Sequence, residues 1–450
     1  MKMTKVAMTI AGVAVAGLVL QGCAADSSAK ESDGGAVDGA GKTLNVLVGA
    51  NTLYPEEQKA WFAEMAATFK EETGAILAYE TFASANDELT KIQTSVLSGQ
   101  GPDVYGLGTT FTPTAYSTGA FLTLTDDDWD KVGGRERFIP ATLGISGPDE
   151  KNQIAVPAAS RPFVLAYNKK LLAAAGIDKP ADSWDGLRDQ AKKLTSGDVY
   201  GIATAYADTY DPYKIVWGMS RQAGNPLVED GTSSLDDPIT VGAYQAVFDW
   251  IIKDKVVNPA AVGWKNSQAL AEFAAGKAAF MVFTSGTSVP TLDASPIADD
   301  YAYALMPTIP PGETALPKDG VAAASILSGD NLVVADYSEN KDLALAYIEQ
   351  VTGAAVQEDY YETFGEFPTN AEAADTILKA NPELAPIVEA AEMSVATPFT
   401  GAWGEIQLAM SNVAVQLIPK LADGSLTDDD VKAAVDEAQT AAQTALDRVK

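Results

Sequence analysis

The sequence contains no histidine and only one cysteine among its 450 residues. Without histidine the chain can form neither a Ser-His-Asp nor a Cys-His catalytic arrangement, and no metal site with a histidine ligand. It also lacks the glycine-rich loops of Walker and dinucleotide-binding motifs. Paired carboxylates for glycoside hydrolysis stay open, because sequence spacing does not show which carboxyl groups lie about 5–9 Å apart. We therefore expect no enzyme, no metal and no cofactor, with a secreted glycoside-active enzyme as the distant alternative.

Basic residues are scarce as well. Lysine and arginine number 31 against 61 aspartates and glutamates, which gives a formal net charge of −30 at pH 7. This excess of acids opposes binding to nucleic acid and electrostatic docking on anionic lipid. It leaves the ligand open, since most of these charges should lie in solvent. With 47% hydrophobic residues, the chain can bury a large core and should form two domains or one two-lobed domain.

The one cysteine, Cys23, closes a separate N-terminal unit. A start with two lysines precedes the apolar run 6–20, which has the length of a signal peptide and is short for a membrane span. The run ends in Leu-Gln-Gly-Cys, which resembles a bacterial lipobox, a motif that is cleaved before a cysteine that then carries lipid. We predict a lipoprotein signal peptide at 1–22, a lipid anchor at Cys23 and a flexible tether at 23–42, with a plain signal peptide or membrane anchor as the alternative. Because Cys23 is unique, no disulfide can form within the chain.

Apolar runs and amphipathic segments alternate after the tether. Strands are expected at 43–49 and 75–82, a helix between them, a second helix at 87–98 and a third strand shortly after it. This order predicts a parallel sheet with right-handed crossovers. At 154–177 the chain leaves this sheet, because Pro157 cannot donate to a sheet ladder and a new apolar run follows it. A second α/β region is therefore expected beyond this point.

Five stretches stand in a characteristic order along the chain: S-G-Q-G-P-D-V at 98–104, the segment 154–177, F-A-A-G-K-A-A-F at 273–280, G-E-F-P-T at 365–369, and the terminal region 421–446. Together they resemble the extracellular solute-binding proteins of ABC importers, in the carbohydrate-type family that includes maltose-binding protein. The resemblance implies an α/β, two-lobed periplasmic-binding-protein-like fold of type II, with hinge strands and a ligand cleft between the lobes. It places lobe 1 at 43–154 plus 307–329 and lobe 2 at 156–300 plus 336–450.

The same resemblance implies a function. The protein would bind a mono- or oligosaccharide in the interlobe cleft, close over it and deliver it to the permease of an ABC importer, without catalysis. It would be a monomer held through lipidated Cys23 on the outer face of the cell membrane, in a Gram-positive cell. The alternative within the binding proteins is a non-sugar or anionic solute, such as a polyol phosphate or a carboxylated sugar.

The resemblance also points to residues of the second α/β region. Tyr213, which follows Asp211 and a proline, matches an acid-Pro-Tyr that supplies a stacking ring and a hydroxyl in maltose-binding relatives; a solvated turn is the alternative. Arg161 stands where these relatives have a ligand-contacting acid. Its guanidinium could bind two vicinal hydroxyls or a carboxylate, or form an interlobe salt bridge. Trp403 resembles an aromatic platform, as Trp217 and Trp264 do less closely, and for each the alternative is a core tryptophan.

Polar residues after the strands complete the candidate site. The loops after the first and third strands should meet at the carboxyl edge of the sheet, and they carry Asn51, Tyr54, Thr109 and Thr110, with Asn86 as a weaker candidate. Many relatives place a tryptophan just after the strand 280–283. This chain has Ser285, Gly286 and Thr287 instead, which can donate hydrogen bonds but not stack. The missing platform disfavours a long glucan and favours a smaller or differently oriented solute.

Overall fold

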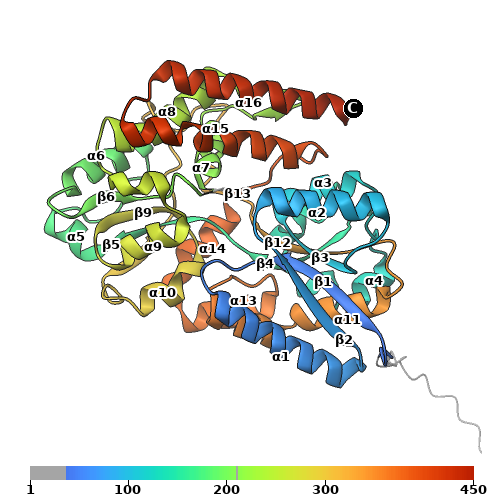
Figure 1. Ribbon diagram of the computed structural model, residues 1–450. Coiled ribbons are helices and arrows are strands. Elements are labelled where there is room, and N and C mark those ends of the chain that lie inside the picture. The colour runs from blue at the N-terminus through green and yellow to red at the C-terminus, as the bar shows by residue number, and fades with distance from the viewer. Residues whose placement is uncertain (1–36, 209–210, 450) are drawn as a thin grey trace, which may run out of the picture. The chain divides into compact units, whose positions relative to one another are not determined.

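The computed structural model describes residues 37–449, except 209 and 210, together with all their side chains apart from those of Ala85 and Asp211 (Figure 1). These residues belong to one unit, which begins at Val37. The predicted signal peptide, the lipid anchor Cys23 and most of the tether lie outside the described residues. Within the described part of the chain, no helix combines the length and the apolar character that crossing a bilayer requires.

The first sheet described has five strands in the order β2-β1-β3-β12-β4. β1, β2 and β3 are parallel, and Val46 of β1 pairs with Tyr79 and with Val104. β12 is antiparallel to both of its neighbours. The strands are β1 (Thr43–Gly49), β2 (Ile76–Phe82), β3 (Val104–Gly108), β12 (Gly329–Val334) and β4 (Ala155–Ser160). The predicted parallel sheet is confirmed, and β12 joins it from a distant part of the chain.

Helices cover both faces of this sheet. α1 (Pro55–Thr73) starts on a proline and ends at Gly74, which has the positive φ of 75° that suits glycine. It packs in one hydrophobic core with Val46, while α2 (Ala85–Ser98) packs in another core with Leu47. Successive residues of a strand point to opposite faces, so α1 and α2 lie on opposite sides of the sheet.

The second sheet described has four strands in the order β10-β5-β9-β6. Its strands are β10 (Tyr301–Ala304), β5 (Val164–Asn168), β9 (Ala278–Thr284) and β6 (Tyr200–Ala203). On one face they share a core with α6 (Trp184–Leu194), α7 (Asp211–Gln222), α8 (Pro238–Ile252), α15 (Trp403–Asp423) and α16 (Asp428–Arg448). On the other face they share a core with α9 (Asn266–Ala274), α13 (Ala371–Ala380) and α14 (Ala385–Glu392).

The remaining described elements connect these layers. The α-helices are α3 (Thr112–Ser117), α4 (Asp126–Lys131), α5 (Lys169–Ala174), α10 (Val289–Asp293), α11 (Lys341–Val351) and α12 (Ala354–Phe364). The short strands are β7 (Val228–Glu229), β8 (Thr232–Ser233), β11 (Ser325–Ile326) and β13 (Ser394–Val395). The 3₁₀ turns are η1 (Thr109–Phe111), η2 (Arg135–Arg137), η3 (Pro140–Ile145), η4 (Pro259–Gly263), η5 (Gly286–Ser288) and η6 (Pro382–Leu384).

Three segments cross from one sheet region to the other: 160–163, 326–329 and 364–369. We call them the crossing segments. Ser160 N–H donates to Phe367 O at 2.8 Å, and Arg161 N–H donates to Ser328 O at 2.9 Å. These bonds join the three segments side by side, so they correspond to the hinge strands that the sequence led us to expect.

Packing differs from the predicted lobe boundaries in two places. Residues 336–450 were assigned to the second lobe, but Leu343 and Ile348 of α11 are buried in the core of the first sheet. Residues 307–329 were assigned to the first lobe, but Gln222 of α7 donates to Pro307 O and Ala323 O, both at 2.8 Å. The segment before β12 therefore packs with the second sheet, and β12 itself marks the crossing. The other predicted boundaries stay a prediction.

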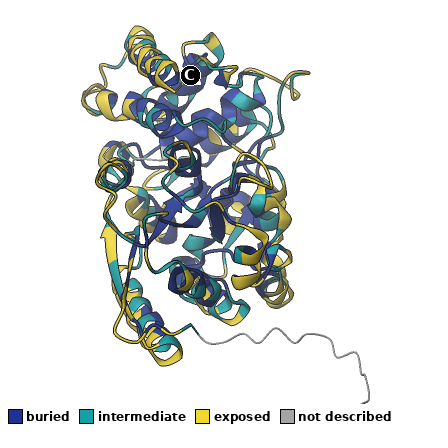
Figure 2. Cartoon of the chain, turned by 90° about the vertical axis from the view of Figure 1, so that its right-hand side faces the viewer, coloured by how far each residue is buried: buried dark blue, intermediate teal, exposed yellow. Residues whose placement is uncertain are grey.

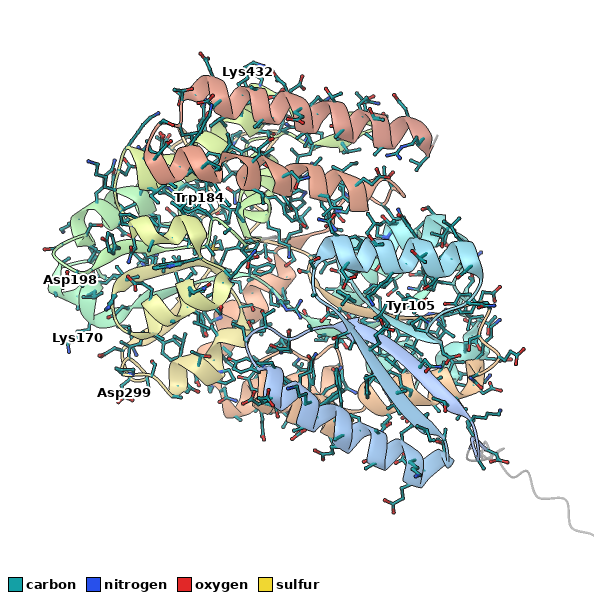
Figure 3. All side chains as sticks on the ribbon, viewed as in Figure 1. Tyr105, Lys170, Trp184, Asp198, Asp299 and Lys432 are labelled. Atoms are coloured by element: carbon teal, nitrogen blue, oxygen red, sulfur yellow. The ribbon has the colours of Figure 1, made fainter. Side chains whose placement is uncertain are left out.

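The acidic excess lies mainly in solvent. Figure 3 shows Asp198, Asp299 and Lys432 at the periphery and Trp184 and Tyr105 among the packed elements. Figure 2 shows buried residues in the strands of the interior, and exposed residues on the outer helices and on the strand at the left of the view. The net charge therefore says little about the interior, as the sequence suggested.

Candidate functional site

A cavity of about 550 Å³ lies where the two sheet regions meet. The last residues of four strands line it, namely Gly49 of β1, Phe82 of β2, Gly108 of β3 and Thr284 of β9. In α/β sheets, ligands bind outside the carboxyl ends of the strands. The position of the cavity therefore follows from the topology of both sheets.

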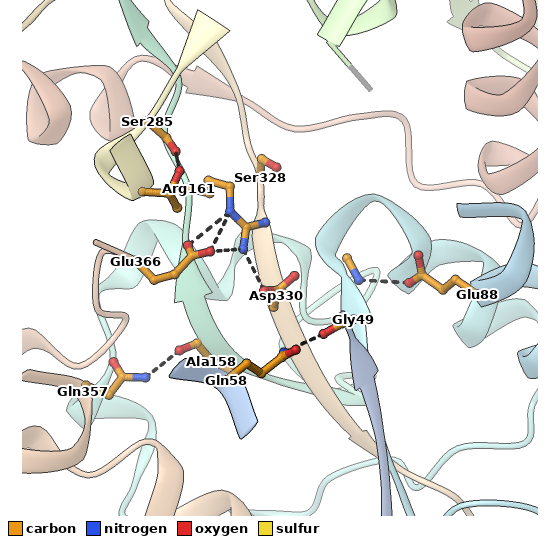
Figure 4. A network of polar contacts seen from close by, with 12 residues as sticks. Gly49, Gln58, Glu88, Ala158, Arg161, Ser285, Ser328, Asp330, Gln357 and Glu366 are labelled. Carbon is orange, nitrogen blue, oxygen red and sulfur yellow. Dashed lines mark hydrogen bonds and ion pairs between the residues drawn. The ribbon is translucent and has the colours of Figure 1, made fainter. Parts of the chain in front are cut away.

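An ion network crosses the wall of the cavity formed by the crossing segments (Figure 4). Arg161 Nε lies 3.0 and 3.1 Å from the two carboxylate oxygens of Glu366, and Nη2 lies 2.9 Å from Asp330 Oδ2. Nη2 also bonds Glu366. Burial works against the charged guanidinium, but Asp330 and Glu366 outweigh it and raise the pKa of Arg161 well above its usual value. Arg161 thus forms the salt bridge that the sequence left as an alternative, and it also lines the cavity.

Glu366 is the most enclosed member of this network. Its side chain is 6% exposed, against 26% for Arg161 and 39% for Asp330. Burial raises the pKa of Glu366, and the nearby Arg161 charge opposes that rise. The carboxylate is therefore held next to the cavity by one guanidinium, and it depends on that partner.

Glu88 of α2 is a second buried carboxylate at the cavity, and the sequence analysis missed it. Its side chain is 2% exposed, and Oε1 accepts a hydrogen bond of 3.0 Å from Gly108 N–H. Burial raises the pKa of Glu88 well above its usual value; the Gly108 bond lowers it, Asp330 raises it and Lys214 lowers it. One signal was available, because Glu88 stands four residues before Ile92 and therefore on the buried face of the helix.

An aromatic pair and a lysine also line the cavity. The rings of Phe163 and Phe283 are stacked, with centroids 3.9 Å apart and an interplanar angle of 15°. Lys214 of α7 is buried, and its Nζ lies 4.7 Å from the centre of the Phe163 ring and 3.4 Å from Ser328 Oγ. Phe283 has a φ of 62°, which is rare for an aromatic residue and strained. The tryptophan that many relatives place just after this strand is absent here, and Phe163 and Phe283 are aromatic residues that line the cavity near it.

Six predicted site residues line the cavity: Asn51, Thr109, Thr110, Arg161, Ser285 and Thr287. Asn51 Oδ1 accepts the N–H groups of Leu53 and Tyr54 at 3.0 and 2.9 Å, which orders the loop after β1. Ser285 and Thr287 hydroxyls lie 2.9 Å apart. These residues offer donors and acceptors at both sheets.

Other predicted residues lie close to the cavity without lining it. Tyr54 OH donates to Thr287 O at 2.6 Å, so it ties the loop after β1 to η5. Gly286 is buried and packs against Gly365. A Cβ added to Gly365 would lie 2.1 Å from Gly286 O, so the two backbones are in close contact. Trp264 is half-buried between two cores, and Asn86 is exposed. None of the four is among the lining residues of the described chain.

The aromatic platform predicted on α7 and α15 is instead part of the core. Tyr213, Trp217 and Trp403 are 0% exposed and pack in the core of the second sheet, where Tyr213 OH donates to Gln407 Oε1 at 3.0 Å. Tyr213 and Trp217 are four residues apart and share one helix face, while Lys214 is turned about 100° away, towards the cavity. Asp211 begins α7, and its side chain is outside the described part.

The described residues contain no group of three or more His, Cys, Asp or Glu side chains arranged to hold a metal ion. The polar groups of the cavity are carboxylates, amides, hydroxyls, lysines and one arginine. Such a lining can bind a polar ligand through hydrogen bonds, with the aromatic pair contacting its apolar face.

The description "Bacterial extracellular solute-binding protein" belongs to a family model that matches residues 64–386. The diacetylchitobiose binding protein DasA of Streptomyces coelicolor is 26% identical over 383 residues, which cover 83% of this chain and 84% of that protein. An ABC transporter solute binding protein of Agrobacterium radiobacter, solved with ribitol, has a TM-score of 0.74 at 21% identity and covers 90% of this chain and 99% of its own. The GacH receptor of Streptomyces glaucescens, solved with acarbose, has a TM-score of 0.71 at 21% identity. The match covers 91% of this chain and 99% of that chain.

The structural likeness confirms the predicted two-lobed α/β fold. The family likeness confirms the predicted resemblance, and it implies a place outside the cytoplasm. Because the matched region spans more than half of the sequence, this chain belongs to the bacterial extracellular solute-binding proteins.

Proposed function

We propose that this protein captures a neutral carbohydrate in the cavity and delivers it to the permease of an ABC importer. The observation that carries the proposal is the lining itself, which combines hydrogen-bonding groups from both sheets with the stacked Phe163 and Phe283 rings. A sugar has apolar C–H faces and hydroxyl edges, and this lining is complementary to both. A ligand that contacts both sheet regions favours the closed state, which is the basis of delivery.

The size of the cavity supports a small carbohydrate. Its volume of about 550 Å³ falls in the range of roughly 300–1,000 Å³ that small-molecule pockets occupy. The similar proteins include one named for binding diacetylchitobiose, one solved with acarbose and one solved with ribitol. A ligand of one to a few sugar units suits this chain better than a long glucan.

The charges of the lining weigh against the anionic alternative. Arg161, the residue expected to bind a carboxylated sugar or a polyol phosphate, already bonds Glu366 and Asp330. The lining contains four acids, Glu88, Asp208, Asp330 and Glu366, against three bases, Arg161, Lys214 and Lys265. An anionic ligand would add negative charge to this excess.

Binding without catalysis is part of the proposal. Glu366 and Asp330 bond the same guanidinium, so each of these carboxylates is already engaged in an ion pair. A glycosidase needs one carboxyl group that gives its proton to the leaving oxygen and a second that attacks or activates water. Chromogenic glycosides should therefore remain intact in the presence of the protein.

The lipid anchor, the tether, the Gram-positive cell surface and the monomeric state belong to the same proposal. The lipobox-like sequence before Cys23 and the small, polar residues after it support the anchor and the tether, and the resemblance to the family supports the monomeric state. Cells fed an alkyne-labelled fatty acid should label the wild-type protein and not a Cys23→Ser variant. Equal labelling of both would reject the anchor.

A ligand screen tests the main proposal. Thermal shift and calorimetry are run with diacetylchitobiose, maltose, ribitol and tagatose, and with glucuronic acid and glucose 6-phosphate as anionic counterparts. At least one neutral compound should raise the melting temperature and bind with a one-to-one stoichiometry. Stabilisation by the anionic compounds alone would favour the alternative solute class, and no shift with any neutral carbohydrate would reject the proposal.

A further inference from the structure

Glu88 is unusual for the helix that carries it. On α2 its neighbours Leu89 and Ile92 are buried in hydrophobic cores, and Glu88 itself is 2% exposed. A carboxylate in such a position loses its hydration and needs compensation from hydrogen bonds or charges. The side chain lines the cavity, so a bound ligand can supply part of that compensation.

One oxygen of the Glu88 carboxylate already accepts a hydrogen bond within the protein. Gly108 N–H, at the end of β3, donates to Oε1 at 3.0 Å. Figure 4 shows this bond reaching one of the two carboxylate oxygens of Glu88. The backbone bond fixes the orientation of the group, and the second oxygen remains available as an acceptor.

The charges around Glu88 come from two further elements. Asp330 of β12 and Lys214 of α7 act on Glu88 electrostatically, and Glu88 in turn acts on buried Tyr213 of α7. On α2 itself, Asp87 accepts from Ala83 N–H at 3.0 Å, and Lys91 pairs with exposed Glu80. Arg161, Lys265, Asp208 and Glu366 line the same cavity, so its lining carries charged groups of both signs.

We infer that Glu88 is a specificity-determining residue of the cavity, whose ionised carboxylate accepts hydrogen bonds from ligand hydroxyl groups. The inference rests on the proposed carbohydrate function. In this inference the bound ligand turns two hydroxyl groups towards α2. The ligand then explains why the fold keeps the charged carboxylate of Glu88 in a buried position. Acidic sugars are excluded at this position because a second carboxylate would meet Glu88 and Asp330.

A purely structural role makes a different prediction. A structural carboxylate would stabilise the fold through the Gly108 bond, so replacement should lower stability. A ligand-binding carboxylate is instead buried at a cost, because burial raises its pKa and so works against the ionised form. Glutamine keeps an oxygen for Gly108 and carries no charge, so Glu88→Gln should be more stable than wild type at neutral pH and bind sugar less well.

The experiment compares wild type, Glu88→Gln and the matched control Asp87→Asn, with diacetylchitobiose and maltose as probes. Calorimetry should show at least about tenfold weaker binding for Glu88→Gln, as expected when a hydrogen bond to a charged group is weakened. Asp87→Asn should bind like wild type. Melting temperature at neutral pH should rise for Glu88→Gln.

The pH dependence adds a readout that a structural role would not give. As the pH falls through the raised pKa of Glu88, the carboxylate gains a proton, so wild-type affinity should fall towards that of Glu88→Gln, whose affinity should stay flat to about pH 5. If wild type binds a sugar and Glu88→Gln binds it equally well, or if Glu88→Gln melts at a lower temperature, the inference is overturned. Failure of wild type to bind any sugar would instead refute the proposed function. In that case a higher melting temperature of Glu88→Gln than of wild type would still identify Glu88 as a destabilising charge.

Discussion

Removing Arg161 should destabilise the protein through the carboxylates it leaves behind. In Arg161→Met, Glu366 would keep its 6% exposure without the guanidinium that now bonds it, beside Asp330 at 39% exposure. Breaking a buried ion pair from one side costs about 3–5 kcal/mol. Arg161 is 26% exposed and Asp330 more so, so solvent screening reduces this to about 2–4 kcal/mol of unfolding free energy.

The sign of the pH dependence follows from Glu366. Burial already raises its pKa, and loss of Arg161, which opposes that rise, should raise it further. Stability lost in Arg161→Met should therefore be largest at neutral pH and should return as the pH falls through the raised pKa, where Glu366 becomes neutral. A double variant, Arg161→Met with Glu366→Gln, should recover most of the loss at neutral pH.

Urea denaturation followed by circular dichroism measures these differences. The control is Arg448→Met, which breaks the exposed pair with Glu405, whose side chains are 59% and 41% exposed. That variant should stay within about 0.5 kcal/mol of wild type. A loss below about 1 kcal/mol in Arg161→Met, or a loss that does not change with pH, would refute the account of the network.

Three further substitutions test the site. Trp403→Ala should cost about 3–5 kcal/mol of stability, because the side chain is fully buried, while calorimetry on the folded protein should find unchanged sugar affinity. Phe163→Ala removes one ring of the stacked pair and should weaken sugar binding about tenfold with little change in pH dependence, since aromatic contact contributes about 0.5–1.5 kcal/mol beyond area burial; unchanged affinity would place the sugar elsewhere. Tyr54→Phe removes the bond to Thr287 O and should raise the dissociation rate in stopped-flow fluorescence a few-fold, as loss of about 1 kcal/mol predicts; an unchanged rate would show that this bond does not hold the ligand-bound state.

Local sequence patterns were sufficient where the physics is local. The parallel strands β1, β2 and β3 and the helices between them follow from apolar periodicity, a proline at the start of α1 and glycine at its end. The polar loops after β1 and β3 reach the cavity because parallel strands share a carboxyl edge. These parts of the fold and site could be predicted without knowing any distant contact.

Helix α7 shows what local sequence patterns could not predict, namely which of its faces meets the cavity. The sequence indicated an aromatic ligand contact near Tyr213, and the spacing of Tyr213 and Trp217 shows that they share a face. Which face meets the cavity depends on α15, whose Gln407 accepts the Tyr213 hydroxyl from 194 residues away. Packing against α15 therefore buries Tyr213 and turns Lys214 to the ligand side.

Arg161 shows most clearly what the sequence determined and what only the tertiary structure decided. The sequence places its guanidinium where the chain leaves the first sheet, and either a ligand or an ion pair could have been its partner. Asp330 and Glu366 are 169 and 205 residues away along the chain, and only the tertiary structure brings them to it. Electrostatic attraction acts over a few ångströms in space, whereas the sequence records only the order of residues along the chain, so the pairing of charges was left for the fold to decide.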